Sequence, residues 1–328
     1  MSKLKALDKK VNLTNKRVIL RVDLNVPISN GKVKDLSRIK KVVPAIKKLA
    51  NKKAKIIIIS HLGRPKGKVN KDLTLKPIAP ILEKLLNLKV YFSNESYGSN
   101  VIKKSKKIKS TEILLLENIR FNKDEELNSP NLAKELSKIG DIYINEAFSC
   151  SHRSHASVCE ITKYIDSYAG EQLIKEVNII KILTTAAKKP ISCIIGGSKI
   201  STKIGVLRNL IPKMQNIIVV GAMANNFIKY KGFNIGKSLF EKNQEKLIEE
   251  IINSCKKNKC NLLTPKDVVV SKDLNSKGNL KKLNDIKEND LILDIGKKTI
   301  KDILKIIDES KTVLWNGPAG YFEVKEFS

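Results

Sequence analysis

Aromatic residues and cysteine are scarce in this chain, and its longest apolar runs are only strand-sized. Aromatic residues make up 5% of the 328 residues, and the five cysteines form no CxxC pair and have no histidine spaced for zinc binding. The lysine-rich N-terminus leads into no apolar segment of the kind that directs secretion. The sequence therefore predicts a soluble, reduced, cytoplasmic protein with no membrane partner, no disulfide scaffold and no zinc module.

Arginine is also scarce, although the formal net charge is +30. Only seven of the 63 basic residues are arginine, and the lysines are spread along the whole chain. A nucleic-acid-binding protein could use such a charge, because lysines that neutralise phosphates release counterions. No basic cluster, however, is interleaved with aromatic residues as in a single-strand-binding groove. We interpret the charge as a solvated lysine coat and predict no specific nucleic-acid partner, keeping nucleic-acid binding as a minor alternative.

Short β-branched runs alternate with longer amphipathic stretches along the chain. The runs that we expect to be strands cover 17–22, 55–60, 89–92, 112–116, 141–145, 191–195, 216–220, 291–294 and 312–315, and a stretch around 169–187 looks helical. Near-continuous apolar strands separated by helices are typical of parallel sheets covered on both faces. The sequence predicts an α/β fold with two doubly wound, Rossmann-like parallel-sheet domains, 1–170 and 171–328, joined by a hinge helix.

Five of the seven arginines lie at or next to expected strand ends in the first half, together with the three histidines. They are Arg21, Arg38, Arg64, Arg120 and Arg153, with His61, His152 and His155. Ligands of such folds gather beyond the carboxyl ends of the strands, and the planar guanidinium can grip a carboxylate or phosphate at two points. Each residue alone could be structural. Together they predict a positive basin for a small, highly charged anion.

Asp23 and Asn25 are two residues apart, so they point to the same side of an extended segment leaving the first strand. They could hydrogen-bond a substrate hydroxyl. Asp23 could equally keep the arginines of the basin aligned, and the sequence leaves both alternatives open.

The second half predicts a phosphate site at IIGGSKISTK (194–203). There a strand runs into two glycines, and we expect a helix to open at Ser198 or Ser201. Gly197 would let backbone N–H groups approach a phosphate, and Lys199 and Lys203 would share one helical face. The spacing is not that of a Walker A loop. Two further strand-to-glycine junctions, 219–227 and 313–323, leave room for a flat nucleotide, with Glu323 a candidate for a ribose hydroxyl.

Six segments together resemble the phosphoglycerate kinase family. RVILRVDLNVP, SHLGRPKG, LLLENIRF, NEAFSCSHRSHAS, GGSKISTKIGVL and VLWNGPAGYFE occur in the family's order and at about its spacing, from about residue 16 to the end of the chain. The resemblance implies a cytoplasmic, monomeric hinge enzyme that transfers a phosphoryl group reversibly between 1,3-bisphosphoglycerate and ADP, giving 3-phosphoglycerate and ATP, with Mg²⁺.

The resemblance and the residue patterns described above together assign the site residues. The N-terminal half would bind phosphoglycerate through Arg21, Asp23, Asn25, Arg38, His61, Leu62, Gly63, Arg64, Arg120, His152 and Arg153. The C-terminal half would bind the nucleotide through Gly197, Lys199, Lys203, Gly221, Asn316, Pro318, Gly320 and Glu323. Arg38, Lys199 and Lys203 would be catalytic in a direct in-line transfer, and no side chain is assigned as a metal ligand.

The chain departs from the family pattern at several points. Ala222 replaces a usual glycine, Lys297 stands where proline is common, and Glu160 stands where glycine is usual. Nothing matches the family's Gly-Gly-Asp loop, which meets the nucleotide phosphates and magnesium, so the resemblance implies that the C-terminal end is incomplete. The alternative function is therefore that of a truncated, non-catalytic phosphoglycerate-binding homologue.

Overall fold

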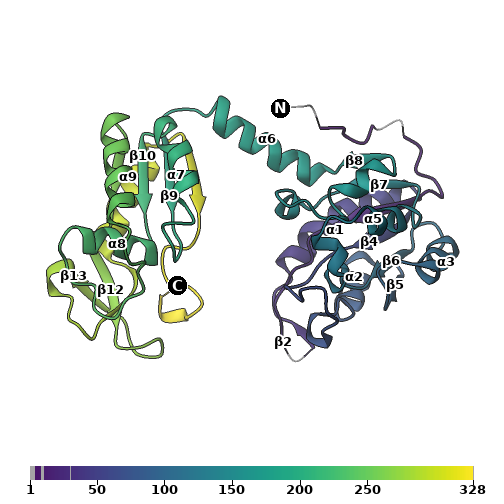
Figure 1. Ribbon diagram of the computed structural model, residues 1–328, viewed down its shortest axis with the longest axis horizontal. Helices are drawn as coiled ribbons and strands as arrows, with labels where there is room; N and C mark the ends of the chain where they lie inside the picture. Colours follow the sequence, from purple (N-terminus) through teal and green to yellow (C-terminus); the bar gives the residue numbers. More distant parts are fainter. Residues whose placement is uncertain (1–3, 9–10, 30, 328) are drawn as a thin grey trace. The chain divides into compact units, whose positions relative to one another are not determined.

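The computed structural model describes residues 4–8, 11–29 and 31–327, and the chain divides into two compact units (Figure 1). Unit one is Met1–Ile180 and unit two is Lys181–Ser328. The division falls within helix α6 (Glu171–Thr185), which occupies the stretch expected to be helical, and lies beyond the predicted boundary at residue 170.

Unit one is built on a six-stranded parallel sheet in the order β5-β6-β4-β1-β7-β8. The strands are β1 (Arg17–Arg21), β4 (Lys55–Ile59), β5 (Val90–Ser93), β6 (Ile113–Leu116), β7 (Ile142–Asn145) and β8 (Ser167–Ala169). The helices are α1 (Ser37–Asn51), α2 (Ile78–Leu86), α3 (Ser99–Lys107), α4 (Lys123–Glu126) and α5 (Pro130–Ser137). A two-residue antiparallel pair, β2 (Ile28–Ser29) and β3 (Lys32–Val33), lies between β1 and α1.

Both faces of the central strands are buried. Ile56 and Ile58 of β4 belong to one hydrophobic cluster, whereas Ile57 and Ile59 belong to another. Because successive side chains of a strand point to opposite faces, the run of four isoleucines supplies both clusters at once. This explains why the parallel strands of this unit could be recognised as continuous apolar runs.

Unit two contains a four-stranded parallel sheet and a separate antiparallel one. The parallel sheet has the order β11-β10-β9-β15, with β9 (Ile191–Ile195), β10 (Asn216–Val219), β11 (Asn261–Leu263) and β15 (Thr312–Asn316). Its helices are α7 (Ile204–Leu210), α8 (Ala222–Tyr230), α9 (Glu245–Lys257) and α10 (Lys297–Glu309). The antiparallel sheet joins β13 (Asn279–Lys282), β12 (Asp267–Ser271) and β14 (Leu291–Ile295).

The expectation that 291–294 would continue the parallel sheet is wrong. This segment forms β14, which pairs antiparallel with β12, a strand that the sequence reading missed. Most of β14 is only half-buried, as in a sheet covered on one face. An apolar run identifies a strand, but the strand that pairs with it is decided only when the chain folds and brings another segment, here the earlier β12, beside it.

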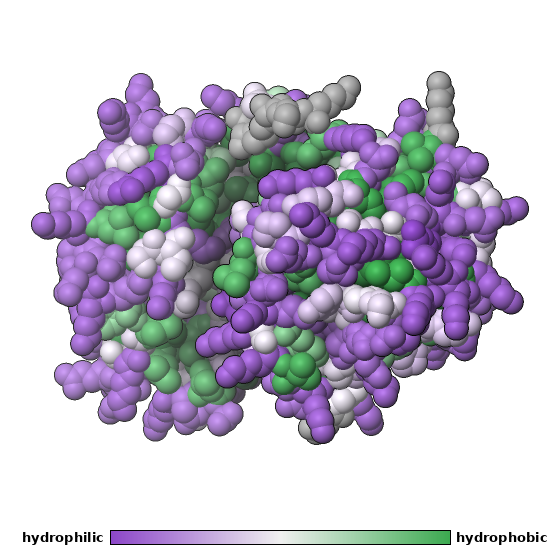
Figure 2. Space-filling view, turned by 45° about the vertical axis from the view of Figure 1, so that its right-hand side comes forward, coloured by the Kyte–Doolittle hydropathy of each residue, from purple (hydrophilic) through white to green (hydrophobic). Residues whose placement is uncertain are grey.

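Short 3₁₀ turns complete the two units: η1 (Lys71–Leu73), η2 (Ile119–Phe121), η3 (Phe148–Cys150), η4 (Glu160–Lys163), η5 (Ile211–Lys213), η6 (Leu283–Asp285) and η7 (Lys325–Phe327). Hydrophilic side chains cover most of the face shown in Figure 2, with smaller hydrophobic patches between them. Within the described ranges, no helix has both the length and the apolar content needed to span a membrane.

Candidate functional sites

The order of the strands in unit one brings the loops after β1, β4, β6 and β7 to one edge of the sheet. These four strands are neighbours in the order β6-β4-β1-β7, and parallel pairing aligns their carboxyl ends. The loops carry six of the eight arginines and histidines singled out in the sequence, and Arg21 ends β1 beside them. Residues more than a hundred positions apart therefore meet in one basin.

Arg21 and His61 form the buried floor of the basin. Arg21 ends β1 and is fully buried, and its Nε atom donates to the Ser157 hydroxyl at 3.0 Å. Its Nη2 atom lies 3.3 Å from Nδ1 of His61. Because a guanidinium only donates, Nδ1 must accept and the imidazole proton must sit on Nε2. Burial, together with the charges of Arg21 and Arg120, lowers the pKa of His61 to about 2, so the ring is neutral.

Asp23 organises a second group of contacts at the rim. Its Oδ2 atom accepts hydrogen bonds from Nη1 of Arg38 and from the Ser149 hydroxyl, each at 2.5 Å. Burial alone would raise the pKa of Asp23, but the hydrogen bonds from Ser149 and the Asn25 amide, with the charge of Arg38, lower it below its usual value. Asn25 Oδ1 accepts from the Gly63 amide at 2.8 Å and so fixes the loop after β4.

Arg38 is not at a strand end, contrary to the sequence reading. It is the second residue of α1, which follows the β2–β3 pair, and its side chain reaches Asp23 from the helix. The sequence analysis placed it at or next to a strand end, because the short β2–β3 pair between β1 and α1 carries no recognisable strand pattern.

Arg120 is buried, and only part of its guanidinium is hydrogen-bonded. Its side chain is 2% exposed, and Nη1 donates to the Gly63 carbonyl at 2.8 Å. Nε and Nη2 have no hydrogen-bond partner among residues 4–8, 11–29 and 31–327, and the Glu126 carboxylate is 3.7 Å from Nε. A buried charged donor without a partner is costly. Two such donors beside the basin suit an anionic ligand.

The other predicted substrate residues divide between the surface and the interior. Arg64 and His152 are exposed, and Arg153 donates from Nε to Nε2 of His152 at 3.1 Å. Leu62 is buried and is held by Asn118, whose side chain bonds both its amide and its carbonyl.

His155 lies behind the basin, with Nδ1 3.7 Å from the fully buried Glu125. Glu125 accepts from the hydroxyl and the amide of Ser157, the residue that holds Arg21. Sequence reasoning missed Glu125, Ser149 and Ser157, since a single Ser or Glu carries no distinctive local signal.

Three glycine turns of unit two pack backbone against backbone at the ends of the adjacent strands β10, β9 and β15. The Gly196 amide donates to the Asn316 carbonyl at 2.8 Å, and the Gly221 amide donates to the Ala319 carbonyl at 2.9 Å. A Cβ atom on Gly196 would lie 2.0 Å from the Pro318 carbonyl oxygen. Gly221 also has a φ of +68°, which favours glycine. The predicted convergence of the three junctions is therefore a direct contact.

The helix expected to open at Ser198 or Ser201 begins later, because α7 starts at Ile204. Ser201 is instead held by Glu241, whose carboxylate accepts from its amide at 2.9 Å and from its hydroxyl at 2.7 Å. Lys199 and Lys203 thus precede the helix and do not share a helical face. Lys203 Nζ donates to Asn316 Oδ1 at 2.6 Å, which links two of the glycine turns.

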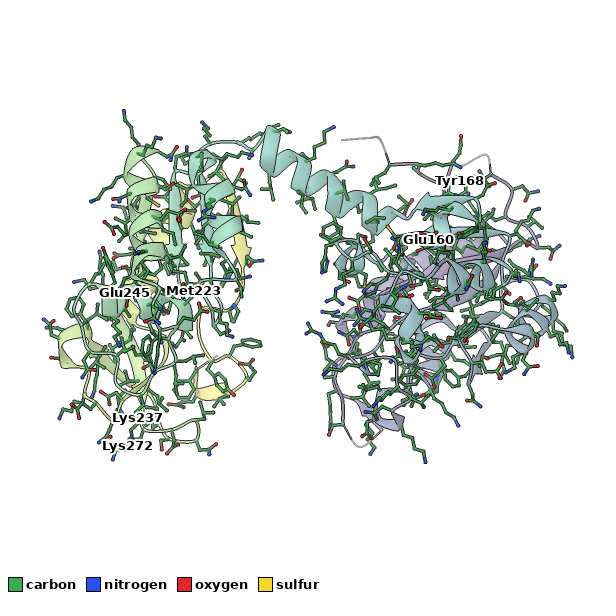
Figure 3. The ribbon with its side chains drawn as sticks, in the orientation of Figure 1. Glu160, Tyr168, Met223, Lys237, Glu245 and Lys272 are labelled. Carbon is green, nitrogen blue, oxygen red and sulfur yellow. The ribbon has the colours of Figure 1, made fainter. Side chains whose placement is uncertain are left out.

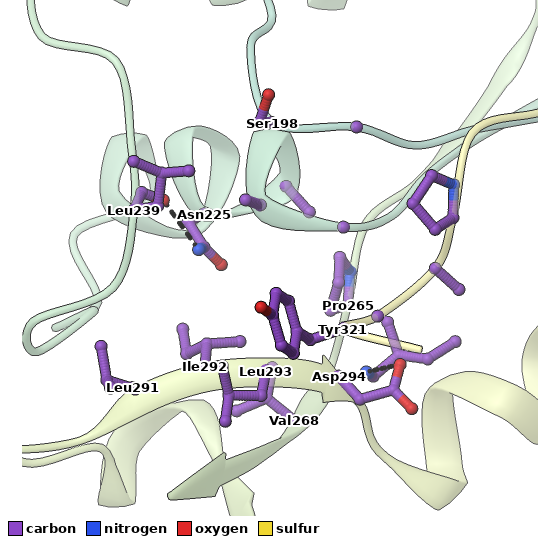
Figure 4. Close-up of a pocket in the computed structure, with 18 of the residues that line it drawn as sticks. Ser198, Asn225, Leu239, Pro265, Val268, Leu291, Ile292, Leu293, Asp294 and Tyr321 are labelled. Atoms are coloured by element: carbon purple, nitrogen blue, oxygen red, sulfur yellow. Dashed lines mark hydrogen bonds between the residues drawn. The ribbon is translucent and has the colours of Figure 1, made fainter. Parts of the chain in front are cut away.

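A cavity of about 710 Å³ opens beside these turns, between α8 and β14 (Figure 4). Five of the predicted nucleotide residues line it: Gly197, Gly221, Pro318, Gly320 and Glu323. Lys199, Lys203 and Asn316 are not in its lining. The sequence reading missed most of the inner lining, including Asn225, Leu239, Ile292, Leu293, Asp294 and Tyr321. Burial raises the pKa of Asp294.

The three departures from the family pattern have ordinary places in the fold. Ala222 is the first residue of α8 and lines the cavity, and Lys297 is the exposed first residue of α10. Glu160 opens η4 in unit one, where it pairs with Lys163 at 2.8 Å (Figure 3). Met223, the second residue of α8 and also labelled in Figure 3, is fully buried in the core of unit two.

Comparisons with known proteins agree along nearly the whole chain. Residues 8–328 match the family model of phosphoglycerate kinase. The chain is 46% identical to the phosphoglycerate kinase of Wolbachia pipientis subsp. Culex pipiens (strain wPip), covering 96% of this chain and 79% of that protein. It is 41% identical to the enzyme of Finegoldia magna, covering 98% of this chain and 82% of that protein.

Solved structures of the same enzyme also superpose on the chain. The phosphoglycerate kinase of Coxiella burnetii gives a TM-score of 0.79 at 35% identity, covering 99% of this chain and 83% of that one. The enzyme of Pyrococcus horikoshii OT3 gives 0.85 at 29% identity, covering 97% and 82%. Nothing in these comparisons supports the alternative of a non-catalytic homologue. The chain belongs to the phosphoglycerate kinase family, whose enzymes transfer a phosphoryl group reversibly between 1,3-bisphosphoglycerate and magnesium-bound ADP.

Proposed function

We propose that the two units divide the phosphoglycerate kinase reaction between them. The basin of unit one would bind 3-phosphoglycerate or 1,3-bisphosphoglycerate, and the glycine turns and cavity of unit two would bind ADP or ATP. The observation that carries the assignment of the basin is Arg120, with two buried guanidinium donors that lack a hydrogen-bond partner in the described part of the chain. An anionic substrate would supply the acceptors that these donors lack.

Within the basin, we propose separate roles for the residues that contact one another. Arg64, Arg120 and Arg153 would hold the charged groups of the substrate, while Asp23 and Asn25 would fix Arg38 and the Gly63 loop through the contacts described above. Arg21 is fully buried and would act through His61. The neutral His61 offers its Nε2–H as a donor without adding a charge.

In unit two, the geometry supports binding of a magnesium-bound nucleotide. The cavity has space for a base and ribose, and the glycine turns expose backbone beside it. Among the described residues, no group of three or more His, Cys, Asp or Glu side chains could hold a metal ion. Magnesium commonly binds to substrate phosphates with few protein ligands, and we propose that the nucleotide phosphates supply most of its ligands here. It would neutralise phosphate charge during transfer.

We propose Arg38, Lys199 and Lys203 as the catalytic cations. In-line transfer needs positioning and charge neutralisation more than covalent chemistry, and each of these cations lies next to one of the two sites. Arg38 is about half exposed and held by Asp23, and Lys203 is held by Asn316. Both are thus oriented before a ligand arrives.

The Arg38→Ala variant tests this assignment. We expect kcat to fall by on the order of a thousandfold, as for arginines that act on a transferring phosphoryl group, with a much smaller rise in KM. Arg17→Ala is the matched control, since Arg17 begins the same unit's first strand and pairs with Asp141 at 2.6 Å. A loss confined to KM would contradict a catalytic role for Arg38.

We also propose that the chain acts as a cytoplasmic monomer without a specific nucleic-acid partner. The lysine coat suggests only weak binding to nucleic acid, falling steeply with salt and independent of sequence. Light scattering after size exclusion tests the monomer, and a titration with duplex DNA at two salt concentrations tests the absence of a specific partner.

A further inference from the structure

Two cysteines of unit two lie at the end of α9 and are not part of the candidate nucleotide site (Figure 1). Cys255 is in the last turn of the helix, and Cys260 directly precedes β11. They are 2% and 6% exposed, and both belong to the same hydrophobic cluster. The fold therefore turns both thiols into one core.

Helix α9 ends in a Schellman motif. The Cys260 amide donates to the Cys255 carbonyl at 2.9 Å, and the Lys259 amide donates to the Lys256 carbonyl at 3.2 Å. Lys259 has the left-handed conformation that this motif requires, with a φ of +52°. The motif commonly brings the side chains at the positions of Cys255 and Cys260 into contact. The backbone thus pairs these two thiols.

The hydrogen bond from the Cys260 amide to the Cys255 carbonyl also limits the distance between the two residues. The covalent bonds on either side of it keep the two Cα atoms within about 7 Å of each other. Disulfides span Cα separations of about 4.4–6.8 Å, and both side chains here belong to one cluster. A disulfide between Cys255 and Cys260 therefore needs little movement of the backbone.

The buried thiols of this cluster differ in reactivity. A hydrogen bond from the Cys260 thiol lowers the pKa of Cys255, against the effect of burial, and raises the pKa of Cys260. The Cys260 sulfur also lies 3.9 Å from the Asn261 carbonyl, a long contact for this weak donor. In Cys193, which belongs to the same cluster, burial raises the pKa to about 11. Because the thiolate is the nucleophile, Cys255 is the attacking sulfur.

We propose that Cys255 and Cys260 form a site of reversible oxidation, at which hydrogen peroxide converts the two thiols into a disulfide. The Cys255 sulfur attacks one peroxide oxygen, the O–O bond breaks, and one water leaves. The Cys260 sulfur then attacks the resulting sulfenic acid, the S–S bond forms, and a second water leaves. The two thiols supply the two hydrogens and two electrons that reduce the peroxide. A small oxidant suits a pair that is almost fully covered.

The disulfide would close the short loop from Cys255 to Cys260 and fix the end of α9. Closing a loop restricts the unfolded chain, so we expect the thermal midpoint of unit two to rise by roughly 4–8 °C on oxidation. The single tryptophan, Trp315, lies on β15 of unit two and reports this transition by fluorescence. Dithiothreitol should return the midpoint to its starting value.

Peptide mapping of the full chain tests the proposal. The chain is treated with peroxide, its free thiols are blocked with iodoacetamide, and it is digested with trypsin without reductant. Trypsin cuts after Lys256, Lys257 and Lys259, so the peptides 247–256 and 260–266 separate unless a disulfide joins them. We expect the two peptides to remain joined, with the mass of two hydrogens lost, and to separate after treatment with dithiothreitol.

Serine variants identify the sulfur atoms involved. Cys255→Ser and Cys260→Ser should each abolish the joined peptides and the rise in the midpoint. Cys193→Ser, at a buried cysteine of the same cluster, and Cys159→Ser, at an exposed cysteine, are the matched controls and should keep both effects.

The peptide map of the unmodified chain decides the inference even if a variant fails to fold. Separate, alkylated peptides after peroxide treatment would overturn it, as would a Cys255 peptide joined to a cysteine other than Cys260. A midpoint that falls when the disulfide forms would contradict its stabilising effect on α9. The outcome does not depend on either ligand site proposed above.

Discussion

The buried His61 predicts a specific loss of stability at mildly acidic pH. His61 is 4% exposed, its Nδ1 atom accepts from Arg21 at 3.3 Å, and its pKa is lowered to about 2 by burial and by the neighbouring arginines. The unfolded chain takes up a proton at this histidine below about pH 6.5, but the folded chain does not. Lowering the pH therefore favours unfolding, and the contribution of His61 to stability, present above pH 6.5, is lost as the pH falls.

The size of the loss follows from the two pKa values. Between pH 8 and pH 5, exclusion of one proton from His61 lowers the free energy of unfolding by ~2 kcal/mol. This figure depends little on the folded value, because any pKa well below 5 leaves the folded ring neutral over the whole range.

The assay is urea unfolding of the wild type and of His61→Asn at pH 5, 6, 7 and 8, followed by circular dichroism. Subtracting the free energies of unfolding of the variant from those of the wild type removes the effect of titrating groups that both proteins share. The remaining difference should change by ~2 kcal/mol from pH 8 to pH 5. Fluorescence of Trp315 marks the transition of unit two, so that of unit one can be recognised. His152→Asn, at an exposed histidine, is the control. A difference that does not change with pH, or an imidazole NMR titration of His61 near pH 6.5, would refute this account of the basin floor.

Further predictions concern backbone contacts and surface charge. Gly196→Ala should destabilise unit two by ~1–3 kcal/mol and impair nucleotide binding, because its Cβ would lie 2.0 Å from the Pro318 carbonyl oxygen; urea unfolding and calorimetry measure the two effects. Gly205→Ala, inside α7 with open space around it, should instead raise the free energy of unfolding by ~0.5–1 kcal/mol. A lower free energy of unfolding in this variant would show that the space is not open. Removing the exposed pair between Arg208 and Glu250 should cost no more than ~1 kcal/mol, and a double-mutant cycle that gives more would contradict its surface character.

The sequence carried enough information to locate most strands of both parallel sheets. The run Ile56–Ile59 is buried on both faces of a sheet, so its composition alone distinguishes it from a half-exposed strand. The orientation of β14 could not be found in the same way. Its antiparallel partner β12 comes from a segment about 20 residues earlier that carries no turn signal tying the two together.

The two candidate sites also combine residues that can be recognised in the sequence with contacts that only the fold creates. Glycines and arginines at strand ends indicated both candidate sites from local sequence alone, because few other residues suit a tight backbone contact or a two-point grip on an anion. The network of Glu125, Ser157, Arg21 and His61 draws on four separate segments, so no local pattern could reveal it.

The sequence by itself determined the family, the alternation of strands and helices, and the glycine-rich and arginine-rich loops, since these depend on residue types close together in the chain. Only the tertiary structure decided which side chains line the cavity and which polar atoms remain unpaired. Asn225 is an unremarkable residue in the sequence. Only the fold pairs its Nδ2 atom with the carbonyl of Leu239, 14 residues later, and leaves its Oδ1 atom buried without a hydrogen-bond partner among the described residues.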